Sequence, residues 1–168
     1  MQNLRQISLL QDNLSEQTKI YSSLCHLLQS ENDYLIQSDV NNINKSAVLK
    51  EGLLRDAEAK EMEREIICKE ISSELRIRSE VPKLLEIATK LPEPHRSKLI
   101  QYKSSLENLF VEIKRLNHEN ELLAEAALST IGGTIDKIKD ALAPKKTYQA
   151  RGQVKDTSQV KHLVHREA

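Results

Sequence analysis

The sequence is poor in aromatic residues, which make up 3% of its 168 residues and include no tryptophan. A globular core that encloses a small-molecule pocket usually has more aromatic surface than this. Long helices that pack along narrow leucine stripes do not need it. The composition therefore favours a helical bundle over an enzyme with an enclosed pocket.

The chain also has no excess charge of either sign, because 25 Lys and Arg balance 25 Asp and Glu. A protein that binds nucleic acid needs many uncompensated cations, so the balance argues against that partner. No apolar run approaches the roughly 20 residues that span a bilayer. The first ten residues lack the basic and apolar regions of a signal peptide. We therefore expect one cytoplasmic domain without stable membrane insertion.

The sequence offers no catalytic, cofactor or metal pattern. Cys25 and Cys68 fall in helical patterns, which is typical of reduced core residues. His162 and His165 could share one helix face, but no Cys or carboxylate pair completes a tetrahedral metal site. No nucleophile is paired with an orienting histidine. We predict that the chain is not an enzyme and holds no cofactor and no metal.

The clearest positive pattern is a heptad seam, in which residues recur at alternating intervals of three and four over about four heptads. Its members are Leu99, Tyr102, Leu106, Leu109, Ile113, Leu116, Asn120, Leu123 and Ala127. A buried Asn in such a seam lowers stability but penalises wrong registers, because only one alignment satisfies its amide. We predict that Asn120 sets the register, and that Asn120→Leu raises thermal stability while relaxing the register or promoting oligomers.

After Ala127 the seam shifts to a second apolar set. Its members are Leu128, Ile131, Ile135, Ile138 and Leu142. A four-residue slip of this kind locally unwinds a supercoil. Gly132 and Gly133 lie at the slip, and each costs roughly 1 kcal/mol in a helix interior. We interpret this end of the helix as a loosened section that is presented to a partner.

Two more long helices and one short helix are predicted upstream, over residues 3–37, 39–78 and 81–91, before the last long helix over 96–143. The first has an apolar face formed by Ile7, Leu10, Leu14, Tyr21, Leu24, Leu28 and Leu35, with Gln17 and Glu31 as polar interruptions. Ser38 or Asp39 is a suitable N-cap for the second. The seam of the second helix is assigned to Val40, Ile43, Ala47, Leu54, Ala57, Ile67, Ile71 and Leu75.

Together these patterns predict an all-α fold, an elongated antiparallel bundle or coiled-coil hairpin of three long helices with a short connector helix, over residues 1–144. Residues 145–168 carry six Lys or Arg against one Asp and one Glu. They hold too few apolar residues to offset the entropy of ordering, so a flexible tail is expected. The spacing of Val160, Leu163 and Val164 is that of a short helix formed on a partner.

Residues 116–123, Leu-Asn-His-Glu-Asn-Glu-Leu-Leu, resemble a helix pattern of the form Leu-Asn-x-x-Asn-x-Leu-Leu. Thr147 and Tyr148, with Gly152 after them, resemble the Thr-Tyr and Gly that follow this helix in the same family. Resemblance at the first corner and second helix covers Glu31, Leu35, Ile36, Asp39, Lys50, Glu51, Leu53 and Leu54. On these residues the chain resembles the FlgN-like flagellar export chaperones of bacteria.

The resemblance implies a cytoplasmic, ATP-independent chaperone without enzymatic activity. Its clients would be the first and third hook-associated proteins, which form the hook–filament junction, and it would deliver them to the flagellar type III export apparatus. Their terminal helices would be masked against premature polymerisation. By position in the family, the client-binding residues would be Ile131, Ile135, Ile138, Leu142, Tyr148, Val154, Val160, Leu163 and Val164.

Two alternatives remain open on the residues alone. The same heptad seams suit a structural coiled-coil adaptor, or an oligomerisation module, that has no export client. A homodimer is also compatible with them.

Overall fold

The structure is a computed structural model that describes residues 2–79 and 82–142. Within this part there are four helices and no strand: α1 (Gln2–Gln37), α2 (Val40–Leu75), α3 (Leu84–Thr89) and α4 (His95–Leu142). The prediction of an all-α fold with three long helices and a short connector is confirmed. The predicted boundary between bundle and tail at residue 144 lies outside the described residues and stays a prediction.

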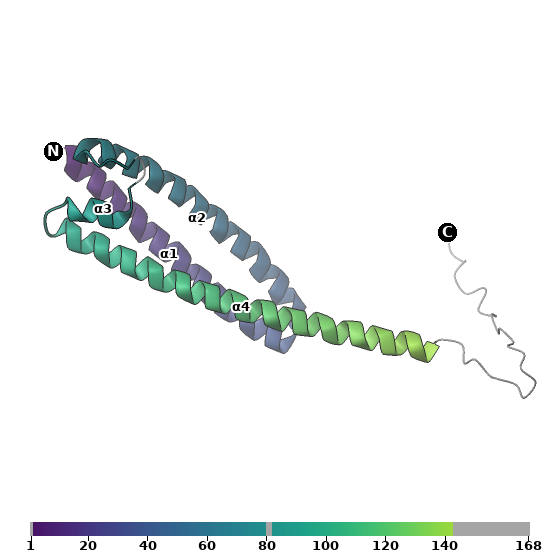
Figure 1. Ribbon diagram of the computed structural model, residues 1–168. Coiled ribbons are helices and arrows are strands. Elements are labelled where there is room, and N and C mark those ends of the chain that lie inside the picture. The colour runs from purple at the N-terminus through teal and green to yellow at the C-terminus, as the bar shows by residue number, and fades with distance from the viewer. Residues whose placement is uncertain (1, 80–81, 143–168) are drawn as a thin grey trace, which may run out of the picture. The chain divides into compact units, whose positions relative to one another are not determined.

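The chain divides into two compact units after Glu125. The first unit contains α1, α2, α3 and the part of α4 up to Glu125 (Figure 1). In the second unit the structure describes residues 126–142, which are helical. No helix of the described residues is long and apolar enough to cross a membrane.

In the first unit, α2 and α4 both pack on α1. Helix α2 runs antiparallel to α1, since a corner of two residues joins them. Helix α4 runs parallel to α1, because Gln11 pairs with His95 near one end and Asn32 pairs with Asn120 near the other. This is the direction that an up–down–up chain imposes on its first and third long helices.

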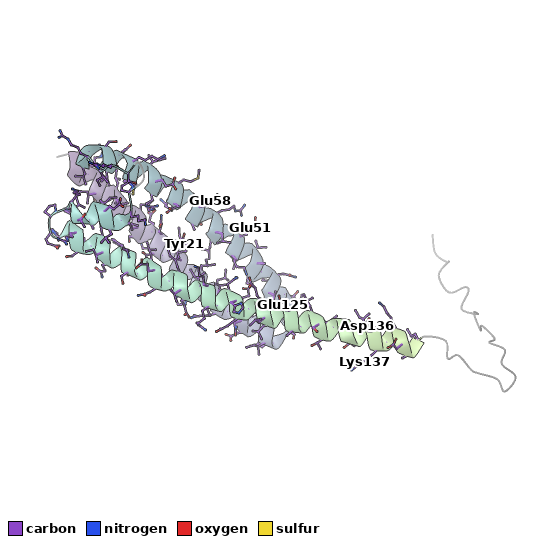
Figure 2. All side chains as sticks on the ribbon, in the orientation of Figure 1. Tyr21, Glu51, Glu58, Glu125, Asp136 and Lys137 are labelled. Atoms are coloured by element: carbon purple, nitrogen blue, oxygen red, sulfur yellow. The ribbon has the colours of Figure 1, made fainter. Side chains whose placement is uncertain are left out.

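The core of the first unit consists of two clusters. One cluster joins all four helices and is formed by Ile7, Leu10, Leu14, Ile67, Cys68, Ile71, Ile87, Ala88, Leu91, Leu99 and Leu106. The other lies further along α1 and α4 and is formed by Leu24, Cys25, Leu28 and Leu116. Tyr21, labelled in Figure 2, packs against both clusters and so links them.

The corner between α1 and α2 shows which residue caps the second helix. Ser38 adopts a left-handed conformation with φ 56°. Asp39 is the N-cap, and its carboxylate accepts hydrogen bonds from the backbone and side-chain amides of Asn42 at 3.2 and 2.7 Å. Of the two predicted candidates, Asp39 therefore satisfies the free amide of the first turn.

The seam assigned to α2 from the sequence is wrong in the first half of that helix. Of the assigned residues, Ile43 is half-buried, but Val40, Ala47 and Leu54 are exposed, whereas the unassigned Ser46 is buried and Leu53 is half-buried. At Ala47 and Leu54 the packed face is thus shifted by one residue, to Ser46 and Leu53. The reason is that polar residues face inward here, so an assignment based on apolar residues alone selects the wrong face. In the second half, Ala57, Ile67 and Ile71 are buried as predicted.

Candidate partner-binding surface

Five large apolar side chains on the last four turns of α4 form what we call the terminal stripe: Leu128, Ile131, Ile135, Ile138 and Leu142. They follow one another at intervals of three and four, which places them on one face of the helix. Their exposed fractions range from 46% to 79%. A single exposed leucine is ordinary, but a row of this length marks an interaction surface.

The rest of this helical segment has only polar or small residues. Thr130 and Thr134 donate hydrogen bonds to the carbonyls of Ala126 and Thr130, both at 2.9 Å. Asp136 and Lys137 follow the stripe residue Ile135, and both are labelled in Figure 2. The segment is therefore amphipathic, with the terminal stripe as its apolar face.

Gly132 and Gly133 lie within the terminal stripe, and α4 remains helical through both. A Cβ atom added to either glycine would meet nothing within 4 Å. Neither glycine is therefore required for close packing against another described residue. Their effect here is to lower helix propensity, by roughly 1 kcal/mol each.

The structure brings together four of the predicted client-binding residues, Ile131, Ile135, Ile138 and Leu142, on this single face. The other five lie outside the described residues: Tyr148, Val154, Val160, Leu163 and Val164. His162 and His165 lie outside them as well. In the described part of the chain, no group of three or more His, Cys, Asp or Glu is arranged to hold a metal ion.

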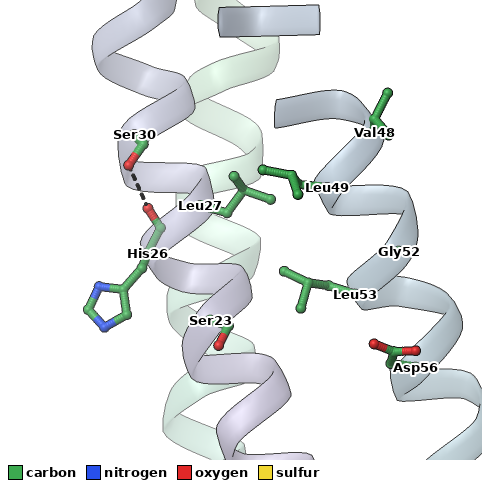
Figure 3. A pocket seen from close by; sticks show the side chains of 9 residues that line it. All are labelled: Ser23, His26, Leu27, Ser30, Val48, Leu49, Gly52, Leu53 and Asp56. Atoms are coloured by element: carbon green, nitrogen blue, oxygen red, sulfur yellow. Dashed lines mark hydrogen bonds between the residues drawn. The ribbon is translucent and has the colours of Figure 1, made fainter. Parts of the chain in front are cut away.

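A groove between α1 and α2 was not anticipated from the sequence. It has a volume of about 520 Å³. In Figure 3, Leu27 of α1 and Leu49 and Leu53 of α2 point toward one another across it, whereas His26 points away. Val48 and Leu49 are exposed. The signal that could have revealed it is the apolar pair Val48 and Leu49, which the seam assignment left unused.

The two cysteines are buried in the first unit and form no disulfide. Burial raises the pKa of both thiols above the ordinary value, and it is the largest effect at each site. Arg64 donates a hydrogen bond to the sulfur of Cys68 at 3.5 Å and partly opposes this rise. Both thiols are thus poor nucleophiles, as expected of core residues.

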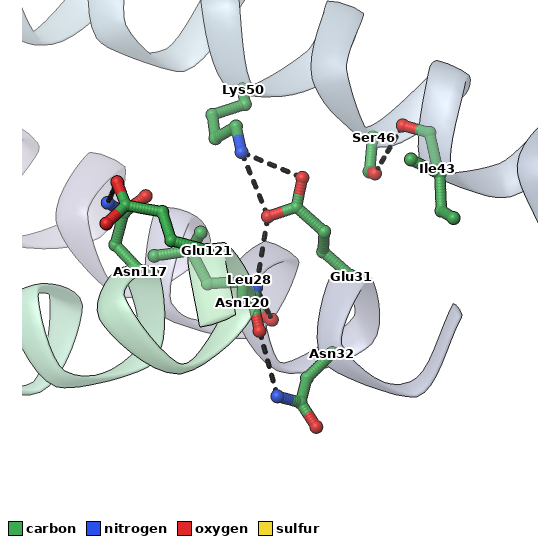
Figure 4. Close-up of polar contacts among 9 residues, drawn as sticks. All are labelled: Leu28, Glu31, Asn32, Ile43, Ser46, Lys50, Asn117, Asn120 and Glu121. Carbon is green, nitrogen blue, oxygen red and sulfur yellow. Dashed lines mark hydrogen bonds and ion pairs between the residues drawn. The ribbon is translucent and has the colours of Figure 1, made fainter. Parts of the chain in front are cut away.

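Asn120 lies at a polar junction between α1 and α4 (Figure 4). Its Nδ2 donates hydrogen bonds to the backbone carbonyl of Leu28 at 2.9 Å and to the carboxylate of Glu31 at 3.0 Å. Its Oδ1 accepts a hydrogen bond from Asn32 at 2.8 Å. The buried amide therefore has a partner at its nitrogen and at its oxygen, and a role in setting the register stays a prediction that these contacts make testable.

Glu31 extends this junction to α2. Lys50 donates to both of its carboxylate oxygens, at 2.7 and 2.9 Å. Glu31 is 7% exposed, so its charge is neutralised by a cation from another helix rather than by water. One connected set of side chains, Asn32, Asn120, Glu31 and Lys50, thus joins all three long helices.

A family model described as "FlgN protein" matches residues 1–156. No curated protein and no solved structure matches the chain.

Proposed function

We propose, since this chain belongs to the FlgN family of flagellar export chaperones, that its clients are the first and third hook-associated proteins. It escorts these hook–filament junction proteins through the cytoplasm to the flagellar type III export apparatus. Its work is binding and release, with no catalytic step, cofactor, nucleic acid or membrane insertion.

The terminal stripe is the observation that carries this proposal. Five large apolar residues at heptad spacing form a seam that a second amphipathic helix completes by knobs-into-holes packing. In the described residues this seam is exposed over its whole length. A client helix laid along it would bury its own apolar face, which is the face that would otherwise drive premature assembly.

Residues beyond the described helix extend the proposed surface. Tyr148, Val154, Val160, Leu163 and Val164 supply its remaining apolar contacts. Six Lys or Arg in residues 145–168, against one Asp and one Glu, supply positive charge. Such charge mainly raises the rate of encounter with an acidic client, whereas the apolar contacts set the rate of dissociation.

Release at the export apparatus requires that binding not be too tight. Ordering a client segment on association costs about 2–5 kcal/mol of the gross interaction energy. Helix-weakening Gly132 and Gly133 add to that cost, because the segment must be held helical to present the stripe. Moderate affinity follows from both effects.

The test is calorimetric titration of each purified hook-associated protein with the full chain and with Ile131→Asp/Ile135→Asp. The matched control is Val111→Asp/Leu122→Asp, which places the same two charges at exposed apolar positions of α4 in the first unit, 69% and 53% exposed. We expect the stripe variant to lose client binding and to stop protecting the client from polymerisation. The control variant should bind and protect the client normally. Normal binding by the stripe variant would refute this assignment of the surface.

The alternative is an oligomerisation module or structural adaptor, because a second copy of the chain could also complete the terminal stripe. Analytical ultracentrifugation separates the two functions. A module is an obligate oligomer that Ile131→Asp/Ile135→Asp dissociates. A chaperone keeps its association state in that variant and loses only its client.

A further inference from the structure

Helices α2 and α4 lie on either side of α1, and α3 lies near one end of the space between them (Figure 1). This space holds a groove of about 530 Å³, which we call the α2–α4 trough. Helix α1 contributes Leu14, Gln17 and Tyr21 to it, and the other lining residues are Glu61, Arg64, Lys83, Leu84, Lys103, Leu106, Glu107 and Phe110. All of these residues belong to the first unit.

The trough gathers the residue types that dominate binding energy at protein interfaces. Tyr21 and Phe110 meet edge to face, with ring centroids 4.7 Å apart and planes at 82°. Phe110 is the one phenylalanine of the chain and is 39% exposed. Arg64 also lines the trough. Aromatic residues and Arg are enriched at binding hot spots. Tyr21, Phe110 and Arg64 therefore give the trough the residue types that a partner protein would contact.

The α2 wall of the trough is acidic. Glu58 and Glu65 lie three residues before and four residues after the lining residue Glu61, so they neighbour it on the helix surface. Both are exposed, and neither makes an ion pair with a described residue. Glu51, one heptad before Glu58, continues the row (Figure 2), although it pairs with Arg55 at 3.9 Å. Between Glu51 and Glu58, Leu54 is exposed.

The α4 wall carries no comparable excess of charge. Lys103 and Glu107 pair with each other at 2.6 Å. On the α2 wall, Arg64 forms an ion pair with Glu61 at 2.5 Å, so it does not neutralise Glu58 or Glu65. Lys83 lines the trough from the connector next to α3. The uncompensated negative charge therefore lies along α2.

We propose that the α2–α4 trough docks a helix of a partner protein, with its apolar stripe on Tyr21, Leu106 and Phe110 and with Lys or Arg on the flank that faces α2. A channel between two helices on top of a third is the place that a fourth helix takes in a four-helix bundle. From Lys103 to Phe110 the lining spans about two turns of α4, and Glu51 extends the acidic row by roughly two turns of α2.

A second copy of this chain fits the trough less well. Its exposed terminal stripe is flanked by Asp136 and Asp140 as well as by Lys137 and Lys139. That flank has no excess of positive charge to set against Glu58 and Glu65. The inference concerns a site in the first unit and does not depend on the client role proposed for the terminal stripe.

The test uses three fluorescent synthetic peptides of about three heptads each, with Leu at positions a and d. The basic peptide has Lys at position e, the acidic peptide has Glu there, and the third has Lys at e but Ser in place of Leu. Fluorescence anisotropy with the full chain, below the concentration at which the peptides self-associate, measures affinity. We expect the basic peptide to bind about tenfold more tightly than either of the others.

Charge reversal on the chain locates the site. Glu58→Lys/Glu65→Lys should weaken the basic peptide about tenfold and strengthen the acidic one. The matched control is Glu70→Lys/Glu74→Lys, which makes the same change of charge at two exposed positions of α2 away from the lining residues. Leu54→Ser should weaken all binding without a change of charge.

Three results would overturn the proposal. The first is absence of binding by the basic peptide, or equal binding by its Ser form, which would indicate charge attraction alone. The second is an equal effect of the Glu70/Glu74 control. The third is a different occupant of the trough. A dimer that Glu58→Lys/Glu65→Lys converts to monomer would show that the occupant is a second copy of the chain. Displacement of the basic peptide by a peptide that copies residues 145–168 would show that the occupant is the chain's own C-terminal segment.

Discussion

The side-chain amide of Asn120 on α4 donates a hydrogen bond of 3.0 Å to the carboxylate of Glu31 on α1, and both residues are buried. The two lie 89 positions apart in the sequence. Lys50 of α2 holds the same carboxylate, so one buried charge is shared among three helices. A buried carboxylate tolerates few alternative alignments, because each slip of a helix would remove a partner that water cannot replace.

Replacing Asn120 by Leu tests this relationship directly. Heptad reasoning alone predicts a more stable chain. The hydrogen bonds change that expectation, because the variant removes partners from Glu31, Asn32 and the carbonyl of Leu28. We expect the free energy of unfolding to fall by about 1–3 kcal/mol in urea titration. Asn117→Leu, which removes only an exposed hydrogen bond to Glu121, is the control. A higher melting temperature for Asn120→Leu would mean that desolvation of the amide outweighs its bonds.

Lys50→Met should destabilise the chain more than Arg55→Met does. Lys50 faces a carboxylate whose side chain is 10% exposed, whereas Arg55 approaches Glu51 at 3.9 Å with both side chains about 70% exposed. An exposed pair contributes about 0–1 kcal/mol. Loss of Lys50 leaves a buried charge without its cation, and we expect a cost of about 1–3 kcal/mol after allowance for partial exposure. Urea midpoints that are equal for the two variants would contradict the prediction, and Lys50→Met/Glu31→Gln should recover part of the loss.

Truncation of the α4 seam should be costly at Leu106 and milder at Leu109. Leu106 is 5% exposed in the larger core cluster, and Leu109 is half-buried beside the smaller one. Leu106→Ala should cost about 2–5 kcal/mol. Val111→Ala, at an exposed position of the same helix, is the matched control and should leave the urea midpoint almost unchanged. Equal midpoints for all three variants would show that this seam is not the packed face.

Acid should destabilise the chain partly through Glu61. The hydrogen bonds from Arg64 lower the pKa of this carboxyl below its usual 4.5, despite partial burial. A lowered native pKa means that the unfolded chain takes up the proton first as pH falls. Stability from this group is therefore present above pH 4.5 and is lost as pH falls through the native pKa. Thermal melts of Glu61→Gln should lose less stability than wild type below that pH, and Glu58→Gln controls for removal of a carboxylate from the same helix face.

Deletion of residues 145–168 tests the proposed client surface from its far end. We expect the melting curve to stay nearly unchanged, since these residues follow Pro144 and lie outside every predicted seam. Client binding should fail, and Leu163→Asp/Val164→Asp should cause most of that loss in the full chain, because apolar contact sets affinity. Calorimetric titration of a hook-associated protein against both chains measures this. A shortened chain that binds with full affinity would place recognition on the described helices.

Much of the fold follows from the sequence because helix signals are local. The spacing of Ile7, Leu14 and Leu28 predicts the buried face of α1, and Asp39 supplies a capping oxygen within its own turn. The interval of three and four from Leu128 to Leu142 predicts one apolar face for the same reason. The eight-residue run at 116–123 that resembles the FlgN family is also a short-range feature, and the family model matches residues 1–156.

Rotation of α2 about its axis was decided only by the tertiary structure. A seam chosen from apolar residues places Ala47 and Leu54 inward, whereas the structure places Ser46 and Leu53 toward α1 and uses Lys50 to meet Glu31. Heptad spacing places Glu31 on the apolar face of α1, but no local signal identifies its partners, since its cation comes from one helix and its amide partner from another. The same holds for the α2–α4 trough, whose walls belong to helices far apart in the sequence. Periodicity determines which residues of one helix share a face, but the neighbour of that face depends on how the helices pack, and here a buried charge stabilises the choice.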